Sequence, residues 1–215
     1  NVLLCHKNSS ILPLRPTTGE PTRSRLFPKT NMPFCVKLVV AWIKALKIKN
    51  YLCSSLVYTN KIKQLSEKLN LQNKTFVYRN NYPSAFCFGF KNPRIYVSTG
   101  LIQILSEIEL EAVLRHEKYH LESKDALMLF FASVTQSLLP FFPIISDISK
   151  NYRIQKEVAA DESVIKGMQQ SDSLISVLRK LVTYEPKNTL AYASFLADWD
   201  TLEIRIKKLV KRKVA

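Results

Sequence analysis

Two histidines and a glutamate lie within the segment HEKYH at positions 116 to 120. On a helix, His116 and His120 are four residues apart and point from the same face, so two imidazoles can bind one metal ion. Glu117 lies beside them, where its carboxylate can act as a general base toward water at the metal. Because the pattern fixes only three positions, it also arises by chance, and the segment alone does not decide the matter.

A pair of acids downstream favours the metal site. In QKEVAAD, Glu157 and Asp161 are four residues apart on a second predicted helix. A catalytic zinc ion takes three protein ligands and keeps one position open, so Glu157 can be the third ligand. Asp161 can accept the free ring N–H of a ligating histidine. An exposed acidic pair is the alternative, but it does not explain the small residues Ala159 and Ala160, which let two helices approach closely.

The elements that position these residues can be read from their surroundings. Ser106 stands three residues before Glu109, a capping box that predicts a helix beginning near Glu107 and carrying HEKYH. Three short runs between residues 75 and 98, TFVYR, AFCFGF and RIYVS, are rich in aromatic and β-branched residues and predict a small antiparallel sheet of hairpins. Asp125 is a further candidate to orient a histidine, although a solvated acid at a helix end is the alternative. Later helices are expected around 172–184 and 201–213.

The uncharged segment 126–146 is long enough to cross a bilayer once. A single crossing is incompatible with the metal site, because His120 and Glu157 would then lie on opposite sides. We therefore expect an apolar helical hairpin, broken at Pro140 and Pro143, which is buried either in lipid or in protein. Basic residues on both sides favour placing the active site at the cytoplasmic face.

Charge and composition divide the chain into three parts. Residues 1–33 contain five of the ten prolines and are expected to be extended or disordered. Residues 34–74 predict basic amphipathic helices, and residues 75–215 form one further domain that carries the candidate metal site. Residues 1–74 hold 13 Lys and Arg against 2 acids, a bias that suits an anionic membrane or nucleic acid. We find no zinc-finger spacing or phosphate loop, so no nucleic acid partner is expected. The four separated cysteines indicate thiols rather than a disulfide framework.

The segment from AFCFGF through HEKYHLESKDAL, followed by EVAAD, resembles the BlaR/MecR family of membrane metallopeptidases, and less closely the HtpX and CAAX-prenyl protease group. The resemblance covers roughly residues 75–168 and implies a gluzincin, a zinc peptidase with HExxH and a later Glu-x-x-x-Asp. It implies that one Zn²⁺ is bound by His116, His120 and Glu157 and that Glu117 is the catalytic base. The strand near Ser84, Ala85 and Phe86 is similar to the edge along which such enzymes bind an extended peptide.

One feature of the HtpX group is missing. No histidine follows His120, so the downstream His-Pro of those enzymes has no counterpart. Three residues, Arg205, Tyr184 and Tyr192, are candidates to stabilise the developing charge on the substrate, with a structural or surface role as the alternative.

The sequence therefore predicts an α+β zincin-like metallopeptidase domain, mostly helical, that cleaves a protein or peptide substrate at a membrane and contacts lipid. A role in BlaR/MecR-like signalling is a further expectation. The alternative is a non-catalytic, membrane-associated scaffold or sensor with the same fold. The sequence does not indicate an oligomeric state.

Overall fold

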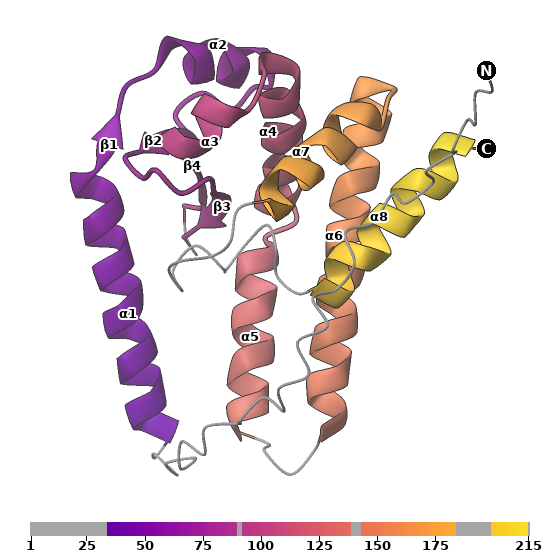
Figure 1. Ribbon diagram of the computed structural model, residues 1–215. Coiled ribbons are helices and arrows are strands. Elements are labelled where there is room, and N and C mark those ends of the chain that lie inside the picture. The colour runs from indigo at the N-terminus through magenta and orange to yellow at the C-terminus, as the bar shows by residue number, and fades with distance from the viewer. Residues whose placement is uncertain (1–33, 90–91, 139–142, 184–198, 215) are drawn as a thin grey trace, which may run out of the picture. The chain divides into compact units, whose positions relative to one another are not determined.

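A computed structural model describes residues 34–89, 92–138, 143–183 and 199–214. The chain divides into two units, Asn1–Pro33 and Phe34–Ala215, and the first lies outside the described residues together with the expectation made for it. Figure 1 shows the helices and strands of the second unit. In chain order they are α1 (Phe34–Ser54), β1 (Leu56–Val57), α2 (Asn60–Lys68), β2 (Thr75–Tyr78), β3 (Ala85–Phe88), β4 (Arg94–Ser98), α3 (Thr99–Ile104), α4 (Glu107–Glu122), α5 (Asp125–Leu138), α6 (Pro143–Met168), α7 (Asp172–Val182) and α8 (Trp199–Val214).

The sheet is mixed, and the prediction of a purely antiparallel sheet was wrong. Its strand order is β1-β2-β4-β3, with β2 and β4 parallel and the other two pairs antiparallel. The hairpin of β3 and β4 folds back so that β4 inserts beside β2, with Val77 opposite Val97. The alternation of residues along a short segment indicates a strand but does not show which neighbouring strand it pairs with. The sequence therefore did not identify the insertion of β4 beside β2.

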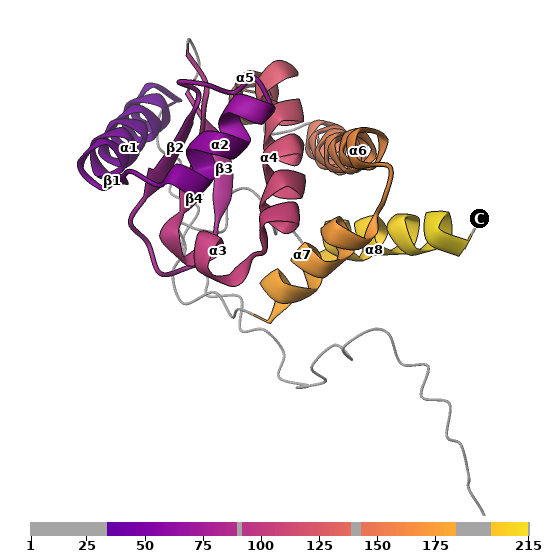
Figure 2. The same ribbon diagram turned by 90° about the horizontal axis from the view of Figure 1, so that it is seen from above.

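The two faces of the sheet pack against different parts of the chain. One face places Val77, Ile95 and Val97 in the main core together with residues of α2 and α4. The other face carries aromatic rings, with Tyr78 and Tyr96 packed against Leu52 of α1. Figure 2 shows α4 and α1 on opposite sides of the strands. The apolar face of the sheet therefore packs against α4 and helps to fix the position of this helix.

Helix α4 begins where the sequence predicts. The Ser106 hydroxyl accepts a hydrogen bond from the Glu109 main-chain N–H, and the Glu109 carboxylate accepts one from the Ser106 N–H. This capping box satisfies two N–H groups that the first turn leaves without helical partners. The Glu109 carboxylate also contacts Ser176 and Lys180 of α7. The start of α4 is thus fixed both within the chain and against another helix.

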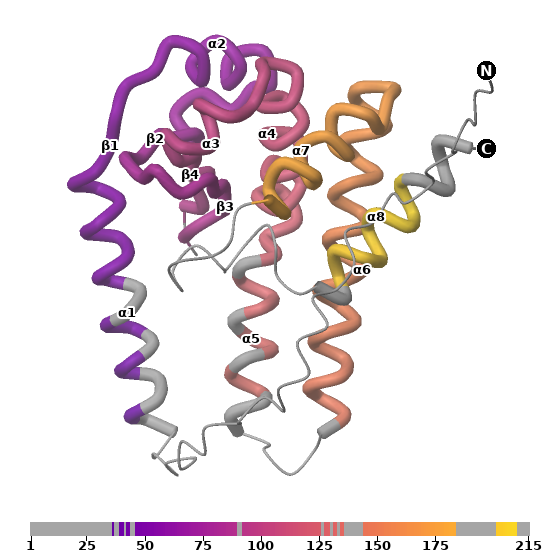
Figure 3. Tube along the Cα trace, viewed as in Figure 1, coloured from indigo at the N-terminus to yellow at the C-terminus, as the bar shows by residue number. Residues whose placement is uncertain are grey.

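The predicted apolar hairpin differs from what the described residues show. Helix α6 runs without a break from Pro143 to Met168, so the expected second arm and the Glu157-bearing helix are one element (Figures 1 and 3). Proline fits the first turn of a helix, where its missing N–H has no partner to lose, and Pro143 therefore begins α6 instead of breaking a hairpin. The connection at 139–142, with Pro140, lies outside the described residues. Among the helices described, none has the length and apolar character needed to cross a membrane.

Candidate metal centre

Helix α4 carries the HEKYH segment, with His116 and Glu117 on its buried side. The apolar residues Leu110, Val113 and Leu114 anchor the helix in the core. His116 and Glu117 are buried, with 0% and 2% exposure, and His120 lies nearer the surface. The helical spacing thus brings both imidazoles to one side of α4, as the sequence predicts.

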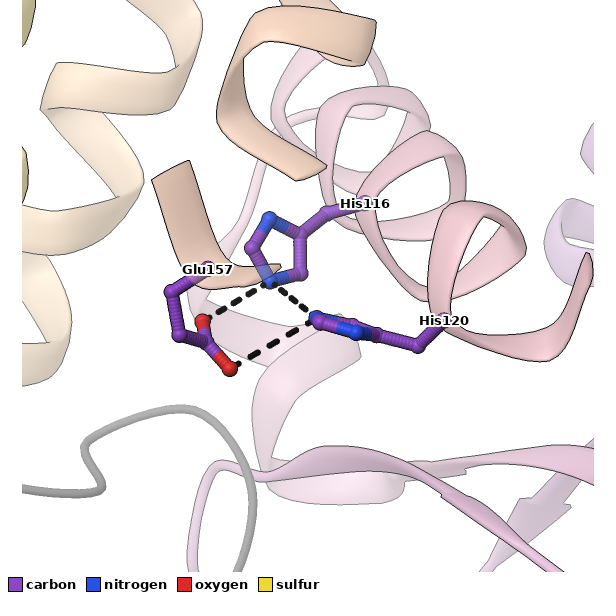
Figure 4. Close-up of side chains that lie close together, drawn as sticks. All are labelled: His116, His120 and Glu157. Atoms are coloured by element: carbon purple, nitrogen blue, oxygen red, sulfur yellow. Dashed lines mark hydrogen bonds and ion pairs between the residues drawn. The ribbon is translucent and has the colours of Figure 1, made fainter. Parts of the chain in front are cut away.

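Helix α6 brings Glu157 and Asp161 to the same place. It packs along α4, and Ala160, which is fully buried, is one of the small residues that permit this approach. The described residues contain one group of three side chains with donor atoms close enough to hold a metal ion: His116, His120 and Glu157. Figure 4 shows the two imidazoles and the carboxylate pointing toward one another.

The distances among these atoms fit a tetrahedral zinc site. The Nε2 atoms of His116 and His120 are 3.1 Å apart. The Glu157 carboxylate oxygens lie 3.3 Å from the His116 Nε2 and 3.6 Å from the His120 Nε2. Ligands about 2.0–2.1 Å from a tetrahedral ion are separated by about 3.3–3.4 Å. Two imidazoles and a carboxylate are also a donor set typical of catalytic zinc, so the residues present fit this ion.

A carboxylate contacts the other nitrogen of each imidazole. The His116 Nδ1 lies 3.0 Å from Asp161, and the His120 Nδ1 lies 2.9 Å from Asp125. Asp125 in turn contacts Lys156 and Tyr152 of α6. With Nδ1 facing a carboxylate, each imidazole turns its Nε2 toward the shared position, where a bound metal ion would displace any proton that Nε2 carries. Both carboxylates that the sequence singled out therefore lie where such a role requires.

Burial and neighbouring charges shift the pKa values of three side chains of the site, His116, Asp161 and Glu117. Burial alone would lower the pKa of His116, but the hydrogen bonds to Asp161 and Glu157 outweigh it and raise this pKa to about 9. Burial opposes ionisation of Asp161, yet Arg205 and His116 lower its pKa to about 2. Burial raises the pKa of Glu117, while the two histidines act in the opposite direction. A carboxyl whose pKa is raised toward neutrality is suited to accept and return a proton.

Arg205 of α8 is the contribution that sequence reasoning missed. Its guanidinium donates two hydrogen bonds of 2.7 Å to Asp161, and its Nη1 lies 3.1 Å from Glu157. The sequence offered it only as one of three candidates to stabilise charge on the substrate. The other two candidates, Tyr184 and Tyr192, lie outside the described residues. No spacing rule links Arg205 to α6, because the two are joined only by the tertiary fold.

The predicted substrate strand lies beside α4. Strand β3 is at the end of the strand order, and the thiol of Cys87 donates to the main-chain carbonyl of Glu117 at 3.1 Å. The Ser84 side chain is buried and contacts Tyr78, and the Phe86 ring packs against Tyr96. These side chains are already engaged, and so is the Ser84 main chain, whose N–H donates to the Ser98 hydroxyl and whose carbonyl accepts from the Ser98 N–H. A peptide bound along β3 would therefore need other main-chain groups of the strand.

Two known proteins resemble parts of this chain in sequence. Regulatory protein BlaR1 of Bacillus licheniformis is 26% identical over 136 residues, which cover 61% of this chain and 22% of BlaR1. A protease HtpX homolog of Herminiimonas arsenicoxydans is 29% identical over 119 residues, covering 54% of this chain and 40% of the homolog. The chain thus spans less than half the length of these relatives.

The fold also has a solved counterpart. The crystal structure of S. mikatae Ste24p superposes with a TM-score of 0.54 at 16% identity, covering 82% of this chain and 56% of that one. At this identity the likeness concerns the fold alone. The sequence profile of the BlaR1 peptidase M56 family matches residues 32–207, most of the chain. The chain therefore belongs to the BlaR1 peptidase M56 family.

Proposed function

We propose that the protein is a zinc-dependent metalloendopeptidase. The observation that carries the proposal is the convergence of His116, His120 and Glu157 on one position, with the second nitrogen of each imidazole against a carboxylate. Three ligands leave a fourth position of a tetrahedral ion open, which distinguishes a catalytic from a structural zinc site. Membership of a peptidase family supports the same conclusion.

The roles of the chain's own residues follow from their places. Zinc held by these ligands would polarise a peptide carbonyl and lower the pKa of water. Glu117 accepts a proton from the attacking water and returns it to the leaving amine as the C–N bond breaks, so water is added across the peptide bond. Asp161 and Asp125 hold the two imidazoles in the orientation that keeps their Nε2 atoms toward the ion.

The substrate is proposed to be an extended segment of a protein. Strand β3 ends the sheet next to the turn of α4 that holds Glu117, and an extended peptide added at a sheet edge gains main-chain hydrogen bonds. Ser84, Ala85 and Phe86 are the residues along which it would lie. A role in BlaR/MecR-like signalling, through cleavage of a regulatory protein, is the finer form of this proposal and is supported by the likeness to BlaR1.

We also propose that the protein acts at a membrane, with the active site on the cytoplasmic side. Three helices carry exposed apolar side chains beside basic or polar ones, an arrangement that suits contact with lipid. These residues are Val39, Trp42 and Ile43 of α1, Met128 and Phe131 of α5, and Ile144 and Ile148 of α6. Flotation with vesicles containing anionic lipid tests the association. Recovery of the protein only in the unbound fraction would contradict it.

The test of catalysis compares Glu117→Gln with the parent protein and with Glu122→Gln. Glu122 is an exposed glutamate of the same helix and serves as the matched control. We expect stoichiometric zinc in all three proteins and chelator-sensitive cleavage of casein by the parent and Glu122→Gln. Loss of the general base should reduce the rate of Glu117→Gln by about 10²–10⁴-fold.

Two outcomes would contradict the proposal. If Glu117→Gln cleaved casein as fast as the parent, the assigned mechanism would be wrong. If the parent bound zinc but cleaved no protein or peptide supplied to it, the alternative of a non-catalytic scaffold or sensor would be favoured.

A further inference from the structure

Each imidazole of the site is backed by a carboxylate, and each of these carboxylates by a cation. His120 contacts Asp125, which contacts Lys156. His116 contacts Asp161, which contacts Arg205. The two arrangements differ in burial, because the Arg205 side chain is 1% exposed and that of Lys156 is 25% exposed. A buried ion pair is hardly screened by water, so Arg205 should interact with its carboxylate more strongly than Lys156 does.

We propose that Arg205 is a positioning residue of the metal centre, which fixes Asp161 and the metal ligand Glu157 as one rigid unit. This inference rests on the proposed zinc site and adds a residue to it. The sequence left open whether Arg205 stabilises charge on the substrate or has a structural role, and this inference favours the structural role, exerted through the two carboxylates.

The contacts of Arg205 support this role. Its Nε and Nη2 atoms each lie 2.7 Å from an oxygen of Asp161, which is the planar fork of a bidentate pair. Its Nη1 remains for Glu157, at 3.1 Å from Oε2. The other Glu157 oxygen, Oε1, lies on the side of His120, 3.6 Å from its Nε2. One guanidinium thus limits the rotation of both side chains.

Electrostatics give a second reason for a cation here. Glu157 and Asp161 are one helical turn apart and almost completely buried, so their negative charges repel each other where water cannot screen them. A buried carboxylate is stable only when it is paired and hydrogen-bonded. Arg205 lies against both carboxylates and supplies the pairing in the absence and in the presence of a metal.

The chemistry of arginine fits the place better than that of lysine. Three donors in one plane reach two carboxylates simultaneously, whereas a lysine ammonium is a point charge on a flexible stem. Arg205 is held by α8, whose Leu202 and Leu209 are also buried in the main core. A helix that follows Asp161 by some forty residues therefore completes a site built on α4 and α6.

The experiment compares Arg205→Met with Lys207→Met in the full chain. Lys207 is exposed on the same helix and pairs with Glu203, so its substitution removes the same charge away from the site. Zinc affinity is measured by competition with a chromophoric chelator, and the ligand geometry by the visible absorption of the Co²⁺-substituted protein. We expect Arg205→Met to bind zinc about 10–100-fold more weakly, with a changed Co²⁺ spectrum, and Lys207→Met to match the parent.

Two further variants separate positioning from folding. Leu209→Ala weakens the packing of α8 but leaves the guanidinium in place, so we expect a lower unfolding temperature with the parent's Co²⁺ spectrum. Arg205→Lys keeps the charge but lacks the fork, so we expect zinc affinity between those of the parent and Arg205→Met. If Arg205→Met does not fold, the zinc affinity and Co²⁺ spectrum of Arg205→Lys test the positioning role instead.

The results that overturn the inference are specific. Parental zinc affinity and Co²⁺ spectrum in folded Arg205→Met, or in Arg205→Lys if only that variant folds, would refute the positioning role while leaving the proposed function intact. A parent protein that binds no stoichiometric zinc would refute the proposed function, and this inference with it.

Discussion

Replacing Glu109 by glutamine tests how the metal-binding helix is anchored. Glu109 is buried at the start of α4, where its carboxylate accepts hydrogen bonds from the Ser106 N–H, the Ser176 hydroxyl and the Lys180 ammonium. Burial opposes ionisation, but the hydrogen bonds from Lys180, Ser176 and Ser106 lower the pKa of Glu109 from 4.5 to about 2. The Glu109→Gln substitution removes the charge and one acceptor while keeping the shape.

The expected loss of stability follows from that pKa. The difference between 4.5 and about 2 corresponds to roughly 3 kcal/mol at about 1.36 kcal/mol per pH unit. The Lys180 side chain is 40% exposed, and water screens its part of the attraction. We therefore expect Glu109→Gln to lower the free energy of unfolding by about 2 kcal/mol at pH 7, or the unfolding temperature by about 4–8 °C.

The lowered pKa of Glu109 also determines how the difference in stability between the parent and Glu109→Gln changes with pH. A carboxyl with a lowered pKa in the folded state contributes its full stabilisation above the unfolded value of 4.5 and loses it as the pH falls toward 2. Denaturant unfolding of the zinc-free parent and Glu109→Gln should thus differ at pH 7 and converge near pH 2. Glu107→Gln removes an exposed charge from the same first turn and is the control for the helix dipole.

Either of two results would refute this reasoning. If Glu109→Gln were no less stable at pH 7 than Glu107→Gln, the buried contacts would contribute nothing beyond the dipole. If the difference between Glu109→Gln and the parent persisted unchanged near pH 2, it could not come from the ionised carboxylate.

The remaining predictions concern the metal centre. Asp125→Asn removes the carboxylate that orients His120, so zinc affinity measured by chelator competition should fall by about 10–100-fold; an unchanged affinity would count against that role. Ala160→Leu overfills the α4–α6 contact and should destabilise the protein by about 1–3 kcal/mol in denaturant unfolding, with weaker zinc binding, whereas the partly exposed Ala159→Leu should be milder. Adding zinc to 100 times its dissociation constant should stabilise the metal-free protein by about 2.7 kcal/mol, and no change in the unfolding temperature would show that the folded site does not bind it.

The residues that the sequence could place are those related by helical spacing. His116 and His120 are four apart on α4, Glu157 and Asp161 are four apart on α6, and each pair faces one side of its helix because the α-helix repeats every 3.6 residues. The start of α4 was equally predictable, since a capping box is a local pattern. These features require no knowledge of what packs against the helices.

The features that the sequence did not yield depend on contacts between distant segments. The insertion of β4 beside β2 is a choice among pairings that alternation does not distinguish. Pro143 was read as a breaker because the sequence does not show whether a proline lies inside a helix or at its first residue. Arg205 could not be assigned to Asp161, since only the docking of α8 brings them together.

The path of the chain between the metal ligands links the site to its apolar helices. Asp125 begins α5 and contacts both His120 and Lys156, so the segment that leaves α4 is fixed at the metal centre at its start and again where α6 returns. Helix α6 is continuous from Pro143 through Glu157, a distance of about 21 Å at 1.5 Å per residue. The apolar start of α6 and the metal ligand Glu157 are therefore parts of one continuous helix, and Glu157 is held in place by the packing of α6 against α4 and by its contact with Arg205.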